Sequence, residues 1–419
     1  MKTTAIIAEY NPFHNGHQYH IEETRRQTGA DFILVLMSGD FVQRGAPALC
    51  NKYIRTRMAL LGGADVVIEL PSLYALSSAE FFAGGAVTLL NQLNVIDTLS
   101  FGSESGNLSL FEKSSRTMIE QADLLISRIK AGLKNGFHYP AARADAVSDL
   151  FINHSDAEEL NALFTYPNNI LGLEYCKALM ALKSSIRPFT LKREDAGYHN
   201  ISVLDHTSSH ISASAIRNAL SQTPEVVAEY VPCEVYQLLA ENSLLTSFLT
   251  EDAFSMALYY KLLTEKEQGF SEYLDCTPDL SDKICKNLPE FTGFTDFCHL
   301  LKSKELTYTR LSRVLMHILF NIKTPEYFRP PLLSRSLFVP YARLLGFKKE
   351  AAPLLSSIKK SSQIPLLSKL ADAGSLLNED AFALLQQDIL CASIYESATF
   401  HHTGRTPLNE LKQSPIILP

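Results

Sequence analysis

The chain lacks the sequence features that mark several large classes of protein. Neither G-x-x-x-x-G-K-[ST] nor G-x-G-x-x-G occurs in its 419 residues, which argues against kinase-like and dehydrogenase-like nucleotide sites. No segment reaches the roughly 18 uninterrupted apolar residues that a membrane span needs, so we expect no membrane partner. The N-terminal apolar run is short and ends at Glu9, which predicts no secretory signal and a cytoplasmic location.

Cysteine spacing is equally restrictive. Seven cysteines are present, but no two are spaced as C-x-x-C. This argues against a zinc ribbon and a dithiol redox site, and we expect reduced thiols and no metal site built from protein side chains. No Ser or Cys stands in a pattern typical of a catalytic nucleophile, which leaves that role to a substrate.

What is present is an ordinary globular composition with an α/β pattern. The chain is 46% hydrophobic and 20% charged, and its length predicts two domains. The strand-like runs are residues 3–8, 31–37, 65–70 and 95–101. Helical patterns begin between or after them, near Asn15, Asn51, Ser77 and Asn107. This alternation predicts a parallel sheet with crossover helices.

The later part of the chain has a mainly helical pattern. Residues 107–183 form a helical excursion, after which residues 186–191 return to the sheet. Beyond Pro224 the pattern is helix after helix, with breaks at prolines. We therefore predict an α/β domain over residues 1–223 and a mainly α-helical domain over residues 224–419.

The strongest single feature is the run AEYNPFHNGHQYH at the end of the first strand. Pro12 forces Asn11 out of the helical region, so the chain turns before a helix begins near Asn15. Unpaired N–H groups at such a helix start attract phosphate. His14 and His17 are three residues apart and project to one side of the first turn, while Gly16 lets a phosphate approach the backbone. We predict His14 and His17 as catalytic residues; the alternative is that they only cap a surface helix.

A second segment, HISASAIRNALSQ, follows the strand at residues 186–191. It opens another helix with Ser212 and Ser214 in its first turn and Arg217 one turn later. Hydroxyls, free amides and a guanidinium would then converge on one point, although a serine at a helix start is more often only an N-cap. His210 precedes this helix without a clear role.

The two segments together resemble the paired signatures of the HIGH-type nucleotidyltransferase superfamily, whose catalytic domain is a Rossmann-like parallel sheet of the HUP type. In that superfamily the first motif holds the α-phosphate region and the second holds the outgoing pyrophosphate. Further runs make the chain similar to one bacterial family, the tRNA(Met) cytidine acetate ligases. These runs are MSGDFVQRGAPALCNKYIRTRMAL, GGADVVIELP, SAEFFAGGAV, FGSES, PNNILGLEY and LKRE-x-x-GYH.

The resemblance implies a specific reaction and a specific site. ATP and acetate would give acetyl-adenylate, and the acetyl group would pass to N4 of the wobble cytidine of elongator tRNA(Met), with Mg²⁺ accompanying the triphosphate. DNA is not an expected partner. In the run PNN the resemblance implies Asn168 as the ATP-binding residue, with Asn169 as the alternative. The ATP site carried over by motif consists of Ile7, Ala8, Glu9, Tyr10, Asn11, Pro12, Phe13, His14, Asn15, Gly16, His17, Gln18, Tyr19, His20, Gly102, Asn168, Arg193, Ser212, Ser214 and Arg217.

Charge is distributed unevenly along the chain. The net charge is −7, but residues 302–360 hold twelve Lys and Arg against three acidic residues, which leaves −16 for the remainder. Such asymmetry is typical of a polyanion-binding face, although a basic run is often only a solvated surface. We predict tRNA contacts from this segment, at Arg310, Arg313, Arg329, Arg335, Arg343, Lys348 and Lys349.

The run SGDFVQRGAP lies after the second predicted strand. Its Asp40, Gln43 and Arg44 are too polar for a buried connection, and we place them at the border of the acceptor or carboxylate site, with an exposed loop as the alternative. Two other functions are compatible with the motifs of the chain: a cofactor adenylyltransferase with a phosphorylated acceptor, and a tRNA-binding scaffold without catalysis.

Overall fold

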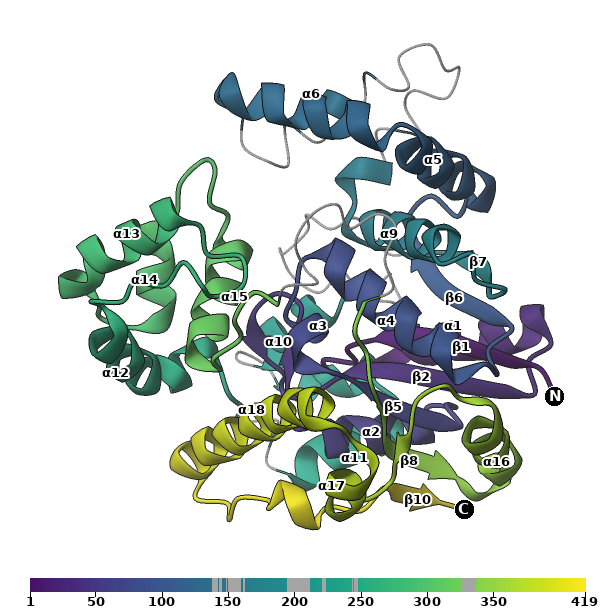
Figure 1. The fold of residues 1–419 in the computed structure, drawn as a ribbon. Helices are drawn as coiled ribbons and strands as arrows, with labels where there is room; N and C mark the ends of the chain where they lie inside the picture. The colour runs from purple at the N-terminus through teal and green to yellow at the C-terminus, as the bar shows by residue number, and fades with distance from the viewer. Residues whose placement is uncertain are drawn as a thin grey trace.

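A mainly parallel central sheet carries the rest of the molecule (Figure 1). The computed structural model describes residues 1–137, 142, 145–147, 149, 160, 163–193, 212–220, 224–242, 244, 248–325 and 337–419. Within these residues the sheet follows the order β10-β8-β5-β2-β1-β6-β7, and β9 pairs with β8 beside this path. The strands of this sheet are β1 (Thr3–Ala8), β2 (Phe32–Ser38), β5 (Val66–Leu70), β6 (Thr98–Ser103), β7 (Arg187–Lys192), β8 (Ala342–Lys348), β9 (Leu366–Leu367) and β10 (Ile416–Leu418).

The predicted parallel sheet is confirmed. Strands β1, β2, β5, β6 and β7 lie within a few residues of the predicted runs, and each pairs in parallel with its neighbour among them. Most residues of β2 and all of β5 are buried, as expected for strands covered on both faces. Two short strands, β3 (Phe41–Val42) and β4 (Ala46–Pro47), form a separate antiparallel hairpin after β2.

The helices between these strands begin where the sequence predicts. Asn51 and Asn107 are N-caps, and their side chains accept hydrogen bonds from the backbone N–H groups of Ile54 and Leu110. Helices α5 and α6 belong to the predicted excursion and project from the β7 side of the sheet (Figure 1). The helices of this half are α1 (Asn15–Thr28), α2 (Lys52–Leu61), α3 (Ser72–Ala75), α4 (Ala79–Leu93), α5 (Leu108–Glu120), α6 (Ala122–Lys134) and α9 (Pro167–Ala181).

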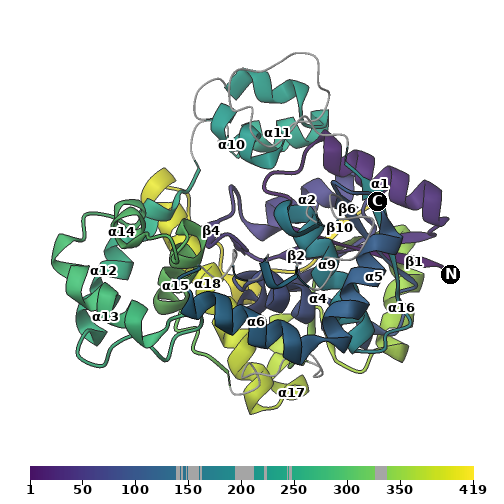
Figure 2. The ribbon, with the colours of Figure 1, turned by 90° about the horizontal axis from the view of Figure 1, so that it is seen from above.

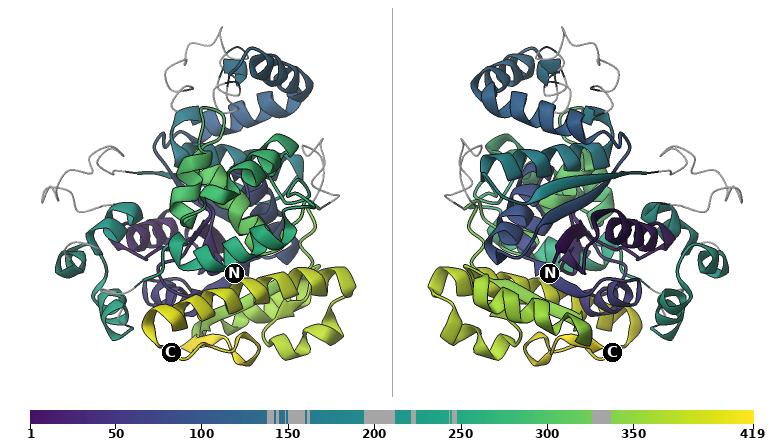
Figure 3. Two further views of the ribbon diagram at one scale, coloured as in Figure 1. Left: turned by 90° about the vertical axis from the view of Figure 1, so that its left-hand side faces the viewer. Right: turned by 90° about the vertical axis from the view of Figure 1, so that its right-hand side faces the viewer.

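The chain beyond residue 212 is mainly helical, as predicted. Figure 2 shows α10 and α11 beside α1, and α12 to α15 as a separate group at another side of the sheet. Figure 3 shows the last helices on the side opposite α5 and α6. The α-helices are α10 (Ala213–Leu220), α11 (Cys233–Glu241), α12 (Ser255–Glu265), α13 (Pro278–Asn287), α14 (Phe294–Leu301), α15 (Tyr308–Leu319), α16 (Ala352–Ser361), α17 (Ala373–Leu376) and α18 (Glu379–Thr403). The 3-10 helices are η1 (Pro224–Glu229), η2 (Glu251–Phe254), η3 (Leu288–Glu290), η5 (Lys349–Ala351), η6 (Leu370–Asp372) and η7 (Glu410–Lys412).

The C-terminal half also contributes strands that the sequence pattern did not predict. Strand β8 pairs antiparallel with β5, and β9 and β10 pair in parallel with β8. A short run such as ARLLGFK, without a clear alternation of polar and apolar residues, cannot be distinguished from a helix by periodicity alone. Both sides of residue 223 therefore supply strands to one sheet, and the division at that residue stays a prediction.

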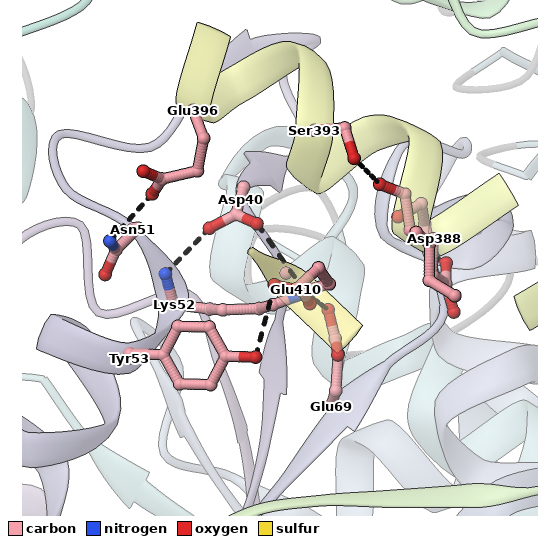
Figure 4. A network of polar contacts seen from close by, with 12 residues as sticks. Asp40, Asn51, Lys52, Tyr53, Glu69, Asp388, Ser393, Glu396 and Glu410 are labelled. Carbon is pink, nitrogen blue, oxygen red and sulfur yellow. Dashed lines mark hydrogen bonds and ion pairs between the residues drawn. The ribbon is translucent and has the colours of Figure 1, made fainter. Parts of the chain in front are cut away.

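A buried network of ionised side chains holds these strands to the first half (Figure 4). Lys52 Nζ lies 2.8 Å from Glu69 Oε1, 2.5 Å from Glu410 Oε1 and 3.6 Å from Asp40 Oδ2. Arg343 Nη1 lies 3.0 Å from Glu69 Oε2 and 2.7 Å from Glu410 Oε1. All five residues are buried. Buried charges are tolerated only when they are paired, so this network ties α2, β5, β8 and η7 together.

The network corrects two sequence-based interpretations. Arg343 is only 4% exposed, its Nη1 pairs with two carboxylates and its Nη2 donates to the Tyr53 hydroxyl, so it belongs to the interior and not to an RNA-binding surface. Asp40 accepts a hydrogen bond from Lys52 N at 2.7 Å inside the same network, so it does not border a substrate site. Along the described chain, no helix combines the length and apolar character that crossing a bilayer requires.

Candidate active site

The first motif lies at the carboxyl end of β1, where the chain turns into α1. The Asn11–Pro12 peptide bond is cis, and Tyr10 adopts a positive φ of 48°. His14 is the N-cap of α1, with extended backbone angles, and its Nδ1 accepts a hydrogen bond from Gly16 N at 3.1 Å. His17 Nδ1 in turn accepts from His14 N at 3.3 Å. The two histidines therefore close the helix start as a reciprocal cap.

This arrangement also decides what the imidazoles present to a ligand. The two rings stack with centroids 3.6 Å apart and planes 24° from parallel. Burial lowers the pKa of His17 well below its ordinary value, and nearby His14, Arg193 and His20 lower it further. A neutral imidazole that accepts at Nδ1 carries its proton on Nε2. Both rings are thus oriented by their caps as Nε2–H donors, and both line the same cavity.

The second segment meets the first directly. Arg217 Nη1 donates to the backbone carbonyl of Asn11 at 2.6 Å, and its Nη2 donates to Ser214 Oγ at 3.0 Å. Asn15 N donates to the carbonyl of Tyr230 at 2.9 Å, just after η1. Ser212 Oγ caps the helix by accepting from Ala215 N at 3.3 Å. Segments about two hundred residues apart thus form one surface, and His210 lies outside the described residues.

The cavity at this surface has a volume of about 1000 Å³. It brings together fourteen of the twenty residues predicted for the ATP site, from five separate segments. Gly102 is the last residue but one of β6, and a Cβ there would lie 3.3 Å from Arg193 Cγ. The predicted residues that line the cavity are Ile7, Ala8, Glu9, Tyr10, Asn11, His14, His17, His20, Gly102, Asn168, Arg193, Ser212, Ser214 and Arg217.

The other predicted residues of the first motif support the turn and do not line the cavity. The Phe13 ring is fully buried and packs against Gly62, where a Cβ would lie only 2.2 Å from Phe13 Cζ. Tyr19 points to solvent and is 43% exposed. The predicted residues outside the cavity lining are Pro12, Phe13, Asn15, Gly16, Gln18 and Tyr19.

The structure separates the two asparagines of PNN. Asn168 lines the cavity and donates from Nδ2 to Glu104 Oε1 at 2.7 Å. Asn169 is fully buried, and its Oδ1 accepts from the backbone N–H groups of Glu104 and Ser105. Asn169 therefore fixes the loop after β6, while Asn168 is placed to meet a ligand.

The loop after β2 forms a further wall. Gln43 N donates to Glu9 Oε1 at 2.9 Å, and Leu49 N donates to Asn11 Oδ1 at 2.7 Å, so this loop is held against the first motif. The buried Arg55 guanidinium stabilises this loop by donating to the backbone carbonyls of Glu9, Ser38, Gly39 and Cys50. Gln43 and Arg44 line the cavity, and their place at the border of the acceptor or carboxylate site stays a prediction.

Sequence reasoning missed a whole group of cavity residues. They come from the start of α4, from α9, from the segment before α12 and from the start of α15. The runs SAEFFAGGAV and PNNILGLEY contain those of α4 and α9, but apolar side chains in them do not indicate a site, and no motif marks those before α12 and at the start of α15. The missed residues of these four segments are Ser78, Ala79, Phe82, Pro167, Ile170, Leu171, Tyr175, Phe248, Leu249, Thr250, Glu251, Thr307, Tyr308 and Thr309.

The basic residues predicted to contact tRNA do not form one surface among those that are described. Arg313 lines the cavity and pairs with Asp275 at 3.6 Å, and Arg310 lies half-buried one turn earlier on α15. Lys348 is the last residue of β8 and Lys349 follows it, and this end of β8 pairs with the beginning of β5. Those two lysines therefore lie at the end of the sheet where the parallel strands begin, opposite the carboxyl ends that border the cavity. Arg329 and Arg335 lie outside the described residues.

No group of three or more His, Cys, Asp or Glu side chains among the described residues is arranged to hold a metal ion. Mg²⁺ commonly binds through substrate phosphates and one or two carboxylates instead of a cage of protein ligands. The side chains of this cavity thus offer hydrogen-bond donors and cations to phosphate, not a preformed metal site.

Comparisons with known proteins agree with this geometry. Residues 1–408 match the family model described as HIGH Nucleotidyl Transferase. A tRNA(Met) cytidine acetate ligase from Clostridium perfringens is 38% identical over 400 residues, covering 94% of this chain and 95% of that protein. Another, from Clostridium acetobutylicum, is 38% identical over 424 residues and covers both chains completely.

Solved structures give the same result. The apo crystal structure of Thermotoga maritima TmcAL superposes with a TM-score of 0.90 at 27% identity, and both chains are covered completely. A second crystal structure of that protein, bound with alpha-thio ATP, gives a TM-score of 0.88. The chain therefore belongs to the tRNA(Met) cytidine acetate ligase family, within the HIGH nucleotidyl transferases.

Proposed function

We propose that this protein uses ATP to activate acetate as acetyl-adenylate and transfers the acetyl group to N4 of the wobble cytidine of elongator tRNA(Met). One observation carries the proposal: the two motifs meet in one cavity, where Arg217 contacts Asn11 and both histidines face the same space. The relatives named tRNA(Met) cytidine acetate ligase and the relative bound with alpha-thio ATP support it. The tRNA substrate places the proposed reaction in the cytoplasm.

In the first step an acetate oxygen attacks the α-phosphorus of ATP in line with the departing pyrophosphate. Negative charge grows on the non-bridging oxygens and on the leaving group, so catalysis depends on positioning and on donors directed at that charge. We assign the α-phosphate region to His14 and His17, and the pyrophosphate to Ser212, Ser214 and Arg217. Mg²⁺ would be held by the phosphates, where it neutralises their charge.

The proposed tRNA contacts are fewer than the charge count predicts. Among the predicted tRNA-contacting residues that the structure describes, Arg310 and Arg313 on α15 lie at or near the cavity and are best placed to contact RNA whose base reacts there. Lys348 and Lys349 could contact the tRNA only if it also reached the end of the sheet where the parallel strands begin.

Pyrophosphate exchange tests the proposal. The purified protein is incubated with ATP, labelled pyrophosphate and one carboxylic acid at a time from a small panel. Incorporation of label into ATP that depends on acetate supports the ligase. Exchange that requires a phosphorylated acceptor would instead indicate a cofactor adenylyltransferase, and nucleotide binding without exchange would indicate a non-catalytic scaffold.

A further inference from the structure

The cavity has a second set of lining residues that the nucleotide does not account for. Its volume of about 1000 Å³ lies at the upper end of the range for small-molecule sites, roughly 300–1000 Å³. Beyond the two motifs it is lined by Thr250 and Glu251 at the start of η2 and by Thr307, Tyr308 and Thr309 at the start of α15. These polar and aromatic side chains belong to neither phosphate-binding segment.

Glu251 connects this second set to the nucleotide end. It is partly buried at the cavity wall, and it lies near enough to Arg217 and to Tyr308 for its charge to act on both. Its neighbour Asp252 has a different role, because Asp252 Oδ1 accepts from Thr295 N at 2.9 Å and does not line the cavity. Glu251 is thus the carboxylate of η2 that faces the cavity.

Tyr308 provides a fixed aromatic surface beside it. Its ring lies against that of His299, with ring centroids 5.1 Å apart. His299 belongs to α14, so the ring packs against the neighbouring helix while part of it remains exposed to the cavity. A held aromatic ring is the usual platform on which proteins stack an unpaired base.

We propose that Glu251 and Tyr308 form the acceptor site, where an unpaired cytosine stacks on Tyr308 and donates its exocyclic amine to the Glu251 carboxylate. A carboxylate is the side chain that matches cytosine N4, because N4 presents only N–H donors. The inference rests on the proposed function and concerns the second substrate of the same cavity. Thr250, Thr307 and Thr309 supply hydroxyls around the base.

The site also supplies what the transfer step needs. The N4 nitrogen attacks the acetyl carbonyl carbon of acetyl-adenylate, a C–N bond forms, and the C–O bond to the AMP phosphate breaks. AMP leaves with the electron pair of that bond, and the proton lost from the amine passes to Glu251. Burial raises the pKa of Glu251, a backbone hydrogen bond and Arg217 lower it, and Asp252 raises it, with a net rise that makes this carboxylate a stronger base than an exposed one.

The experiment separates the two steps. Enzyme is first incubated with ATP and acetate, tRNA is then added, and acetyl transfer is followed in a single turnover; acetate-dependent pyrophosphate exchange is measured in parallel. We expect Glu251→Gln to slow transfer about a hundredfold and to leave exchange within about twofold of wild type. Asp252→Asn is the matched control: because Asp252 only adjusts the pKa of Glu251, we expect it to leave exchange unchanged and to slow transfer by less than about threefold.

Three results would overturn the inference. Transfer by Glu251→Gln at the wild-type rate would remove the carboxylate from the step. Loss of exchange together with transfer would assign Glu251 to the nucleotide end. An equal loss in Asp252→Asn would show a general effect of charge on η2. Failure of wild-type enzyme to exchange at all would reject the proposed function instead, which keeps the two failures distinct.

Tyr308 gives a second, independent test. We expect Tyr308→Phe to retain stacking and transfer, and Tyr308→Ala to raise the tRNA concentration for half-maximal transfer about tenfold while exchange is unchanged.

The pH profile adds a readout specific to a base. Transfer by wild type should fall as Glu251 is protonated at low pH, with Arg217, Asp252, Cys298 and Tyr308 as the titratable or charged groups around it. A Glu251→Gln profile with the same acid limb would contradict the assignment.

Discussion

Single residues in the cavity act through the protonation state that burial imposes on them. His17 is kept neutral because a charged imidazole would lose hydration and would lie beside Arg193. A neutral ring whose Nδ1 accepts from the backbone becomes a donor at Nε2. The helix cap and the proposed catalytic donor are therefore the same side chain, and the cap fixes the direction of the donor.

Removal of either imidazole should affect the activation step. We expect His14→Ala or His17→Ala to reduce acetate-dependent pyrophosphate exchange at least about a hundredfold, since a donor directed at transition-state charge contributes about 3 to 4 kcal/mol. Affinity for tRNA, measured by filter binding, should stay near wild type. Tyr19→Phe, on the exposed side of the same helix, serves as the control. Unchanged exchange in both alanine variants would remove the histidines from the chemistry.

The buried histidines also predict how stability depends on pH. Burial, assisted by nearby Arg193, lowers the pKa of His20 to about 4, whereas an unfolded histidine titrates near 6.5. Between these values the unfolded chain binds a proton that the native state does not, so stability falls as pH decreases from about 6.5 to 4. We expect the melting temperature of His20→Asn to fall less than that of wild type when the pH is lowered from 7.5 to 5. Identical losses would contradict the lowered pKa.

Residue-level patterns in the sequence predicted the two motifs but not the burial of charges. The spacing of His14 and His17 and the order of Ser212, Ser214 and Arg217 are local, so the sequence alone indicates each group. The contact between the two groups is seen only in the folded structure. Arg343 was placed on a basic surface by a charge count, which contains no information about which residues are covered. Its partner Glu410 is 67 residues away in sequence, and only the folded structure brings the two together.

At the scale of elements, the turn after β1 depends on how closely α2 approaches it. The end of α2 has glycine at residue 62, and the Phe13 ring occupies the space that a side chain there would need. Phe13 in turn contacts Tyr10 and His17, with ring centroids 4.8 Å and 5.6 Å away. The packing of α2 therefore supports the cavity through one ring.

We expect Gly62→Ala to disturb this contact. The added Cβ would lie 2.2 Å from Phe13 Cζ, and overpacking of this kind costs about 1 to 3 kcal/mol. Urea unfolding should show the loss, and ATP affinity should fall because Phe13 shifts against His17. Gly374→Ala is the matched control: a Cβ there meets nothing within 4 Å, so stability should be unchanged or slightly higher. Similar losses in the two variants would show that the Phe13 contact is not responsible.

Element boundaries in the first half were predictable because apolar alternation and N-cap residues mark them, as at Asn51 and Asn107. Strand β8 was not predictable for a physical reason. It is buried between β5 and β10, so its residues 342–346 are apolar or covered on both faces and show no period of two. Its pairing partner β5 precedes it by more than 270 residues, and no local signal reports that pairing.

At the scale of the whole molecule, the network around Lys52 and the pairing of β5 with β8 connect the two halves of the chain. Asn51 Nδ2 donates to Glu396 Oε1 at 2.9 Å, and Ser72 N donates to Asp388 Oδ1 at 2.7 Å, so α18 is joined to the first half as well. Burial raises the pKa of Asp388 to about 6, whereas Lys52 and Arg343 help to lower that of Glu410 to about 2. The catalytic sheet is thus completed by residues from the end of the chain.

This connection predicts the behaviour of the isolated first half. A fragment of residues 1–223 would lack β8, leaving β5 as an open edge, and would lose Arg343 and Glu410 from around Lys52 and Glu69. Breaking a buried ion pair costs about 3 to 5 kcal/mol, a large part of the 5 to 15 kcal/mol that stabilises a typical protein. We expect the fragment to unfold without a cooperative transition in urea and to bind no ATP. The full chain should unfold cooperatively and should bind ATP. A cooperative fragment that binds ATP would instead establish residues 1–223 as an independent domain, and the C-terminal strands would then be an addition to a sheet that is already complete.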